Sequence, residues 1–69
     1  MNNIEETLIS VVVPVYNAEK YVMQAVESAL QFDLVQEIIL VEDRSPDNAL
    51  EICQQLAYKN QRVKLFQHP

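Results

Sequence analysis

The sequence contains no glycine, no tryptophan and a single cysteine among its 69 residues. Average usage would give about 7% glycine, so the chain lacks both the Walker A loop and the GxGxxG dinucleotide fingerprint, which need glycine at fixed positions. One cysteine cannot form an internal disulfide, and no cysteine–histidine cluster offers a structural metal site. If the chain helps to bind a nucleotide, it does so without a glycine-rich phosphate-binding loop.

Basic residues are also scarce, with five lysines and arginines against ten acidic residues and a net charge of -5. This balance disfavours nucleic acid and anionic membrane surfaces as partners. The longest apolar run, residues 8–15, is interrupted by Ser10 and Pro14 and is far shorter than the roughly 20 residues of a membrane helix. Residues 1–7 contain two acids and no basic stretch, so we predict an N-terminal tail and no signal peptide.

Apolar runs and stripes alternate along the rest of the chain. Residues 8–13 and 38–41 are β-branched and almost continuously apolar, which is typical of strands buried on both faces of a parallel sheet. Apolar residues recur at helical spacing over 21–30 and 49–57, and residues 63–66 alternate as a short third strand. The order predicts an α/β fold, a partial Rossmann-like βαβαβ unit with a three-stranded parallel sheet.

Local signals place the ends of these elements. Pro14 has no N–H, so we expect it to end the first strand. Asn17 is predicted to cap the first helix, with Glu19 in the first turn facing the positive end of the helix dipole. Residues 45–47, Ser-Pro-Asp, predict the start of the second helix as a hydroxyl cap, a proline at the first helical position and an acid.

Two loops follow the carboxyl ends of the first two strands, where open parallel sheets bind their ligands. They are residues 14–19 and 42–47. If the strands are neighbours, Tyr16 and Asp43 share one site, with a ring face for stacking on a planar base and a carboxylate to accept from a ring N–H. The alternative is structural: Tyr16 only wedges its loop, and Asp43 only favours the N-terminus of the second helix.

Two motifs flank the first predicted helix. The first is Ile-Ser-Val-Val-Val-Pro-Val-Tyr-Asn at residues 9–17, and the second is Val-Glu-Asp-Arg-Ser-Pro-Asp at residues 41–47. Together they resemble the opening of the family 2 glycosyltransferases of the GT-A fold, whose second signature reads V-D-D-G-S-x-D. The resemblance covers residues 8–66. It implies that residues 8–69 are the donor nucleotide-binding, amino-terminal part of an incomplete GT-A domain.

The resemblance also implies roles for individual residues. Tyr16 would pack on the base of a nucleotide-sugar donor, and Asp43 would accept a hydrogen bond from its ring N–H. Pro14 and Glu19 would line or brace the same pocket. Arg44 stands where the family commonly has glycine, so a left-handed backbone there would be unfavourable, and its side chain is predicted to lie exposed beside a neighbouring carboxylate.

By the same resemblance, the full-length enzyme transfers a sugar from a nucleotide-diphosphate-sugar donor, with a UDP-sugar expected, to an acceptor hydroxyl on a carbohydrate or glycan. A divalent cation, Mg²⁺ or Mn²⁺, would neutralise the departing diphosphate. The family's metal-binding D-x-D motif and catalytic base lie beyond residue 69, so no catalytic or metal-binding residue is assigned here, and we expect the chain alone to be inactive.

The location and assembly of the chain are further expectations. We expect a cytoplasmic protein, with a peripheral position on a membrane left open for the full-length enzyme. A sheet cut after its third strand exposes an edge and an apolar face, so we also expect self-association.

Two other interpretations remain open from the residues. Residues 38–43 resemble the acidic strand end of a phosphoacceptor receiver domain, with Glu42 and Asp43 as magnesium-binding acids. Against this, a complete strand–helix unit precedes the motif. The third interpretation is a non-catalytic interaction module.

Cys53 lies on the apolar stripe of the second helix and is predicted to be a buried structural thiol, and His68 is predicted to be exposed and without a role.

Overall fold

The computed structural model describes residues 8–68, which form a single three-stranded sheet and two helices. In chain order the elements are β1 (Ile9–Val15), α1 (Val22–Leu30), β2 (Val35–Glu42), α2 (Ala49–Lys59) and β3 (Val63–Gln67). All strand pairs are parallel, in the order β1-β2-β3 with β2 in the centre. The predicted βαβαβ order is confirmed. The predicted N-terminal tail, residues 1–7, lies outside the described residues.

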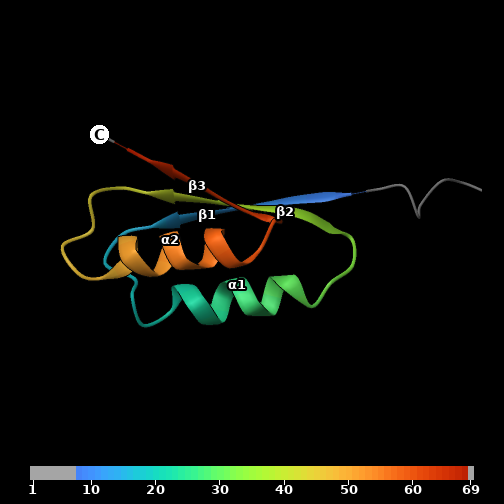
Figure 1. The fold of residues 1–69 in the computed structure, drawn as a ribbon, viewed down its shortest axis with the longest axis horizontal. Helices are drawn as coiled ribbons and strands as arrows, with labels where there is room; N and C mark the ends of the chain where they lie inside the picture. Colours follow the sequence, from blue (N-terminus) through green and yellow to red (C-terminus); the bar gives the residue numbers. More distant parts are fainter. Residues whose placement is uncertain (1–7, 69) are drawn as a thin grey trace, which may run out of the picture.

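Both helices cover the same face of the sheet (Figure 1). The register places Val13 of β1 opposite Leu40 of β2, and Ile38 of β2 opposite Val63 of β3. Side chains of alternate strand residues point to one face, and those facing the helices make the core. The core residues are Val15, Val22, Val26, Val35, Ile38, Leu40, Ala49, Cys53, Leu56 and Val63.

Cys53 is fully buried on the inner side of α2, which confirms the prediction of a structural thiol. Burial, followed by the nearby Glu42 carboxylate, raises the pKa of the Cys53 thiol to about 11. The thiolate is therefore scarce at neutral pH, and Cys53 serves packing rather than nucleophilic chemistry.

Neither helix of the described residues has the length and apolar character needed to cross a membrane.

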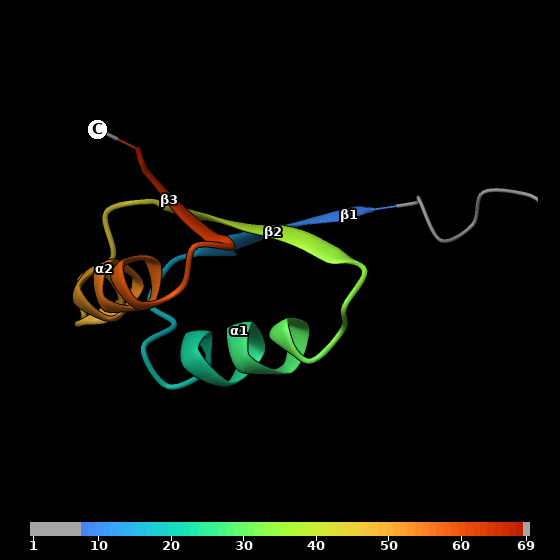
Figure 2. The same ribbon diagram turned by 45° about the vertical axis from the view of Figure 1, so that its right-hand side comes forward.

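Both helices lie on one side of the sheet, so no element of residues 8–68 covers the opposite face (Figure 2). That face carries exposed apolar side chains. Val12 of β1 is 60% exposed and Phe66 of β3 is 59% exposed. The prediction that the strands are buried on both faces is therefore wrong for this part of the chain, whereas the predicted exposed apolar face is confirmed. Self-association through that face stays a prediction.

Pro14 lies inside β1, opposite Val41 of β2, so the prediction that it ends the strand is wrong. Successive residues of a strand direct their backbone groups to opposite sides. The Val15 carbonyl faces β2, because it accepts from the Asp43 N–H at 3.0 Å. Pro14 therefore faces the free edge of β1, where a missing N–H costs no hydrogen bond of the described sheet.

Helix α1 begins at Val22, later than predicted. Asn17 does not cap it: its φ of 54° lies in the left-handed region, which asparagine tolerates better than most residues. The Asn17 N–H instead donates to Ser45 Oγ at 3.0 Å. The N-cap is Tyr21, without a side-chain hydrogen bond, and Glu19 precedes the first turn.

Helix α2 also begins later than predicted, at Ala49 with Asn48 as its N-cap. The Ser45 hydroxyl does not cap α2, because its Oγ accepts the Asn17 N–H from the loop after β1. Asp47 satisfies one of the N–H groups that a helix leaves unpaired at its start, since its Oδ1 accepts from the Ala49 N–H at 3.0 Å. The prediction that Asp47 stabilises the start of α2 is thus confirmed, although the helix begins two residues after it.

Arg62, just before β3, ties the amino-terminal end of the sheet to α1. Its guanidinium donates to the Val35 carbonyl from Nε at 3.0 Å and Nη2 at 2.6 Å. It also donates to the carbonyls of Phe32 at 2.9 Å and Leu30 at 3.3 Å. Leu30 ends α1, so the positive charge lies at the negative end of the helix dipole.

We predict that Arg62→Met lowers the free energy of unfolding by about 1–3 kcal/mol, because three carbonyl groups lose a charged donor. The matched control is Lys64→Met, which removes the same charge from an exposed side chain of β3 and should change stability by less than about 0.5 kcal/mol. Urea denaturation followed by circular dichroism measures both. Equal losses for the two variants would contradict the role assigned to Arg62.

Candidate functional site

The carboxyl ends of the strands meet at a hollow of about 310 Å³. It is lined by Pro14, Val15, Tyr16, Val41, Asp43 and His68. The structure thus brings together three of the four predicted site residues, Pro14, Tyr16 and Asp43. The parallel pairing of β1 with β2 places them there, because each follows or ends a strand at the same edge of the sheet. Their role in binding stays a prediction.

Tyr16 and Asp43 both remain accessible in this hollow. The Tyr16 residue is 62% exposed, so its ring is available for stacking. The Asp43 side chain is 55% exposed, and its Oδ1 lies 3.6 Å from Arg44 Nε and 3.6 Å from His68 Nδ1. Exposed pairs at this distance contribute little stability. The carboxylate therefore keeps the capacity to accept further hydrogen bonds.

His68 is exposed, as predicted, and it also lines this hollow. Its backbone N–H donates to the Glu42 carbonyl at 2.8 Å, which extends the pairing of β3 with β2 by one residue. The imidazole consequently lies beside Asp43. The sequence did carry a signal: His68 lies two residues after the end of the third predicted strand, and the carboxyl ends of parallel strands share one edge.

Glu19 lies outside the hollow that contains Tyr16. It lines a neighbouring hollow of about 300 Å³ with Asn17, Lys20, Tyr21 and Asp47. Its Oε1 accepts from the Asn48 N–H at 2.7 Å. Of the two roles expected for Glu19, lining or bracing, this geometry fits bracing.

Glu42 has a structural role that the sequence analysis did not predict, since it considered this residue only as a magnesium-binding acid of a receiver domain. It is only 2% exposed, and its Oε1 and Oε2 accept from the N–H groups of Arg44 at 3.1 Å and Ser45 at 2.6 Å. A hydrogen bond from the Ser45 side chain, followed by these backbone donors, lowers the pKa of the Glu42 carboxyl below 4.5, while burial acts in the opposite direction. A carboxylate at the end of a buried strand, just before a turn, was the available signal.

Glu42 offers little access to a cation, because its side chain is buried and each of its oxygens already accepts a backbone N–H. Within residues 8–68 no group of three or more histidine, cysteine, aspartate or glutamate side chains is placed to hold a metal ion. The described residues therefore do not fit the divalent cation that the resemblance implies for the full-length enzyme.

Arg44 adopts a left-handed backbone with φ of 52°, as expected for a position where glycine is common. A residue with a Cβ is strained there by roughly 1–2 kcal/mol. Its side chain is 71% exposed and lies beside Asp43, as predicted. The strain persists because Glu42 accepts the Arg44 N–H on one side of the turn.

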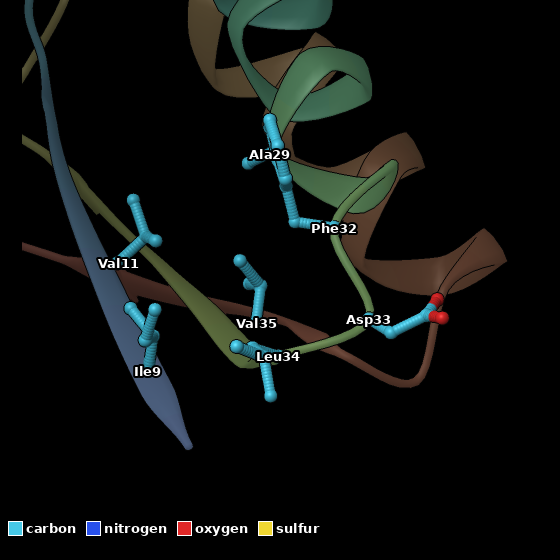
Figure 3. A pocket seen from close by; sticks show the side chains of 7 residues that line it. All are labelled: Ile9, Val11, Ala29, Phe32, Asp33, Leu34 and Val35. Carbon is cyan, nitrogen blue, oxygen red and sulfur yellow. The ribbon is translucent and has the colours of Figure 1, made fainter. Parts of the chain in front are cut away.

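A third cavity, of about 430 Å³ and apolar, lies at the opposite end of the sheet; Figure 3 shows the side chains that line it. Aliphatic and aromatic side chains line it: Ile9, Val11, Ala29, Phe32, Leu34 and Val35, with Asp33 at the rim. The Asp33 carboxylate points away from the apolar side chains in Figure 3. This cavity lies at the amino ends of β1 and β2, so it is separate from the loops that carry Tyr16 and Asp43.

Comparison with known proteins identifies the family. The sequence model of the family described as Glycosyl transferase family 2 matches residues 10–69. The chain belongs to glycosyltransferase family 2. This match favours the glycosyltransferase interpretation over the receiver-domain interpretation. The βαβαβ unit is accordingly the amino-terminal part of a GT-A fold.

Individual relatives in family 2 are similar over most of this chain. It is 44% identical over 63 residues to an uncharacterized glycosyltransferase of Haemophilus influenzae, covering 90% of this chain and 25% of the relative. It is 48% identical over 60 residues to glycosyltransferase GlyG of Streptococcus pneumoniae, covering 86% and 20%. A chondroitin synthase of Pasteurella multocida is 36% identical over 63 residues, covering 90% and 6%.

The chain therefore spans a quarter or less of the length of these family 2 relatives. No solved structure matches it significantly.

The ionised form of Glu42 stabilises the fold, because its pKa is lower in the folded chain than in the unfolded chain. We predict that this stabilisation is complete above pH 4.5 and is lost as the pH falls through the folded pKa. Glu42→Gln should lower the free energy of unfolding by about 1–3 kcal/mol at neutral pH and flatten its acid dependence. Urea denaturation across this pH range checks both, with Glu51→Gln as an exposed control. A wild-type slope retained in Glu42→Gln would contradict the prediction.

Replacing Arg44 by glycine should relieve the left-handed strain. We predict that Arg44→Gly raises the free energy of unfolding by about 0.5–1 kcal/mol, after the greater entropy of glycine in the unfolded chain is subtracted. Arg44→Ala removes the same side-chain contact with Asp43 but keeps the Cβ, so it should bring no gain. Thermal unfolding of the three proteins separates the two effects, and a gain shared by both variants would contradict this account.

Proposed function

We propose that this chain forms the base-binding part of the donor site of a nucleotide-sugar-dependent glycosyltransferase, with UDP as the donor nucleotide. The observation that carries the proposal is the placement of Tyr16 and Asp43 in one hollow. Membership of glycosyltransferase family 2 supports the same chemistry. The full-length enzyme would then transfer the sugar to an acceptor hydroxyl on a carbohydrate or glycan.

Tyr16 supplies the stacking surface in this proposal. Stacking of a base on an aromatic ring is worth about 1–3 kcal/mol and tolerates any base, because every base has a π-face. Val15, Pro14 and Val41 form the apolar lining beside the ring. The stack therefore contributes affinity and leaves the choice of base to a polar group.

Asp43 supplies that polar group. An ionised carboxylate only accepts hydrogen bonds, and uracil carries an N–H at ring position 3 where cytosine carries an acceptor nitrogen. Asp43 thus attracts uracil and repels cytosine at the same atom. Because the Asp43 side chain is 55% exposed, water can satisfy part of an unpaired group, so this hydrogen bond gives a preference for uracil over cytosine and not an exclusion of cytosine.

The residues of this chain bind and orient the nucleotide but leave the chemical step to other parts of the enzyme. In the family a divalent cation neutralises the departing diphosphate, and the described residues do not fit such an ion. We assign no proton transfer or metal contact to them. The chain alone is accordingly proposed to be inactive in sugar transfer.

We predict that the chain binds UDP more tightly than CDP, and that Tyr16→Ala weakens UDP binding about tenfold or more, the equivalent of about 1.4 kcal/mol. Asp43→Asn should lose the preference for UDP over CDP, because an amide can donate as well as accept. Titration calorimetry or NMR titration measures each affinity.

Matched controls lie away from the hollow. Tyr58→Ala removes a tyrosine that is 92% exposed on α2, and Asp33→Asn removes a charge at the other end of the sheet. Both should bind UDP as the wild type does. Equal weak binding by wild type, Tyr16→Ala and Asp43→Asn would remove the site assignment, and sugar transfer by the purified chain would refute its proposed inactivity.

A further inference from the structure

Three hydrogen bonds join the loop after β1 to the loop after β2. The Asn17 N–H donates to Ser45 Oγ at 3.0 Å. The Glu19 N–H donates to Asp47 Oδ2 at 3.1 Å. The Asn48 N–H donates to Glu19 Oε1 at 2.7 Å. Each bond spans 28 or 29 residues of sequence, so none of them is a local turn.

Glu19 and Asp47 form a reciprocal clasp, which we define as the last two of these bonds. Glu19 gives its backbone N–H to the Asp47 side chain and receives the Asn48 N–H on its own carboxylate. Both bonds involve a carboxylate, and charge-assisted hydrogen bonds are about twice as strong as neutral ones. The clasp therefore holds the two loops at a set separation.

In each loop, the clasp residue follows the residue of the proposed base pocket closely in sequence. Tyr16 precedes Glu19 by three residues, and Asp43 precedes Asp47 by four. The segments between them contain both left-handed residues, Asn17 and Arg44. Ser45 Oγ and Glu42 Oε1 hold the N–H groups of these two residues, whereas the clasp sets how the two loops lie against each other. Loss of the clasp would therefore change how Tyr16 faces Asp43.

Glu19 is also unavailable as a ligand of the base. Its carboxylate is engaged by Asn48 and lines a different hollow from that of Tyr16 and Asp43. We therefore infer that Glu19 is a positioning residue of the donor site and that Asp47 is its partner: the two hold the ring of Tyr16 and the carboxylate of Asp43 in register for the base. This inference rests on the proposed function.

The test compares four forms of the chain. Glu19→Ala removes the acceptor of the Asn48 N–H, whereas Glu19→Gln removes the charge but keeps an acceptor oxygen in the same place. Glu51→Ala is the matched control, because it removes an exposed acid from the first turn of α2 without touching the clasp. UDP titration and NMR of the amide of Asn48 are recorded for each.

We expect Glu19→Ala to weaken UDP binding about tenfold and to speed exchange of the Asn48 amide proton about tenfold. The resonances of Tyr16 and Asp43 should shift without ligand. Glu19→Gln should restore most of the affinity and slow the exchange again, because it keeps the acceptor and loses only the charge assistance of the bond. Glu51→Ala should change none of these measurements. Rescue by glutamine separates a positioning role from a charge that contacts the ligand.

Two results would overturn the inference: unchanged UDP affinity in Glu19→Ala, or affinity in Glu19→Gln as low as in Glu19→Ala. If Glu19→Ala fails to fold, Asp47→Asn replaces it, because this variant keeps one acceptor for Ala49 and removes the charged acceptor of Glu19. Unchanged affinity there would count equally against the clasp.

Absence of UDP binding by the wild type would refute the proposed function alone. The clasp would then be judged from the ligand-free spectra. Unshifted resonances of Tyr16 and Asp43 in Glu19→Ala would refute it.

Discussion

The site depends on one buried carboxylate. Glu42 ends the central strand with almost no exposure, yet its oxygens receive the N–H groups of the two residues that turn the chain toward α2. A buried charge is tolerated only when donors surround it, so the turn cannot open without leaving Glu42 unsatisfied. Asp43, which follows directly, is thereby directed to the edge of the sheet. Because Ser45 also accepts from Asn17, the same carboxylate indirectly fixes the loop that carries Tyr16.

The lack of glycine makes this support necessary. Both loops contain a residue with positive φ, Asn17 in one and Arg44 in the other, where glycine would adopt the conformation without strain. In each case the backbone N–H of the strained residue donates to a side chain, Ser45 Oγ or Glu42 Oε1. The chain thus obtains its sharp turns from polar side chains rather than from backbone freedom, and the turns are correspondingly less free to move.

This origin of the turns explains which features could be predicted from the sequence. Strand order and the inner helix faces follow from runs and stripes of apolar residues, which are local patterns. The helix starts were predicted too early because the Asn17 backbone N–H donates to Ser45 Oγ in the other loop, and a partner 28 residues away leaves no local signal. Pro14 was misplaced for a similar reason: whether its missing N–H matters depends on which side of β1 pairs. The burial of Glu42 was not predicted because it is a property of the assembled sheet.

Some residues of the candidate site could likewise be predicted from local sequence patterns, whereas the position of others depends on contacts between distant segments. Tyr16 and Asp43 could be predicted together because each follows a buried strand, and neighbouring parallel strands end at one edge. His68 follows the third strand at that edge and lines the same hollow. Glu19 shares a loop with Tyr16 but turns toward α2, because the first unpaired N–H groups of a helix attract a carboxylate. A base can thus be held by a ring and a carboxylate that belong to different loops, provided that the loops are bonded to each other.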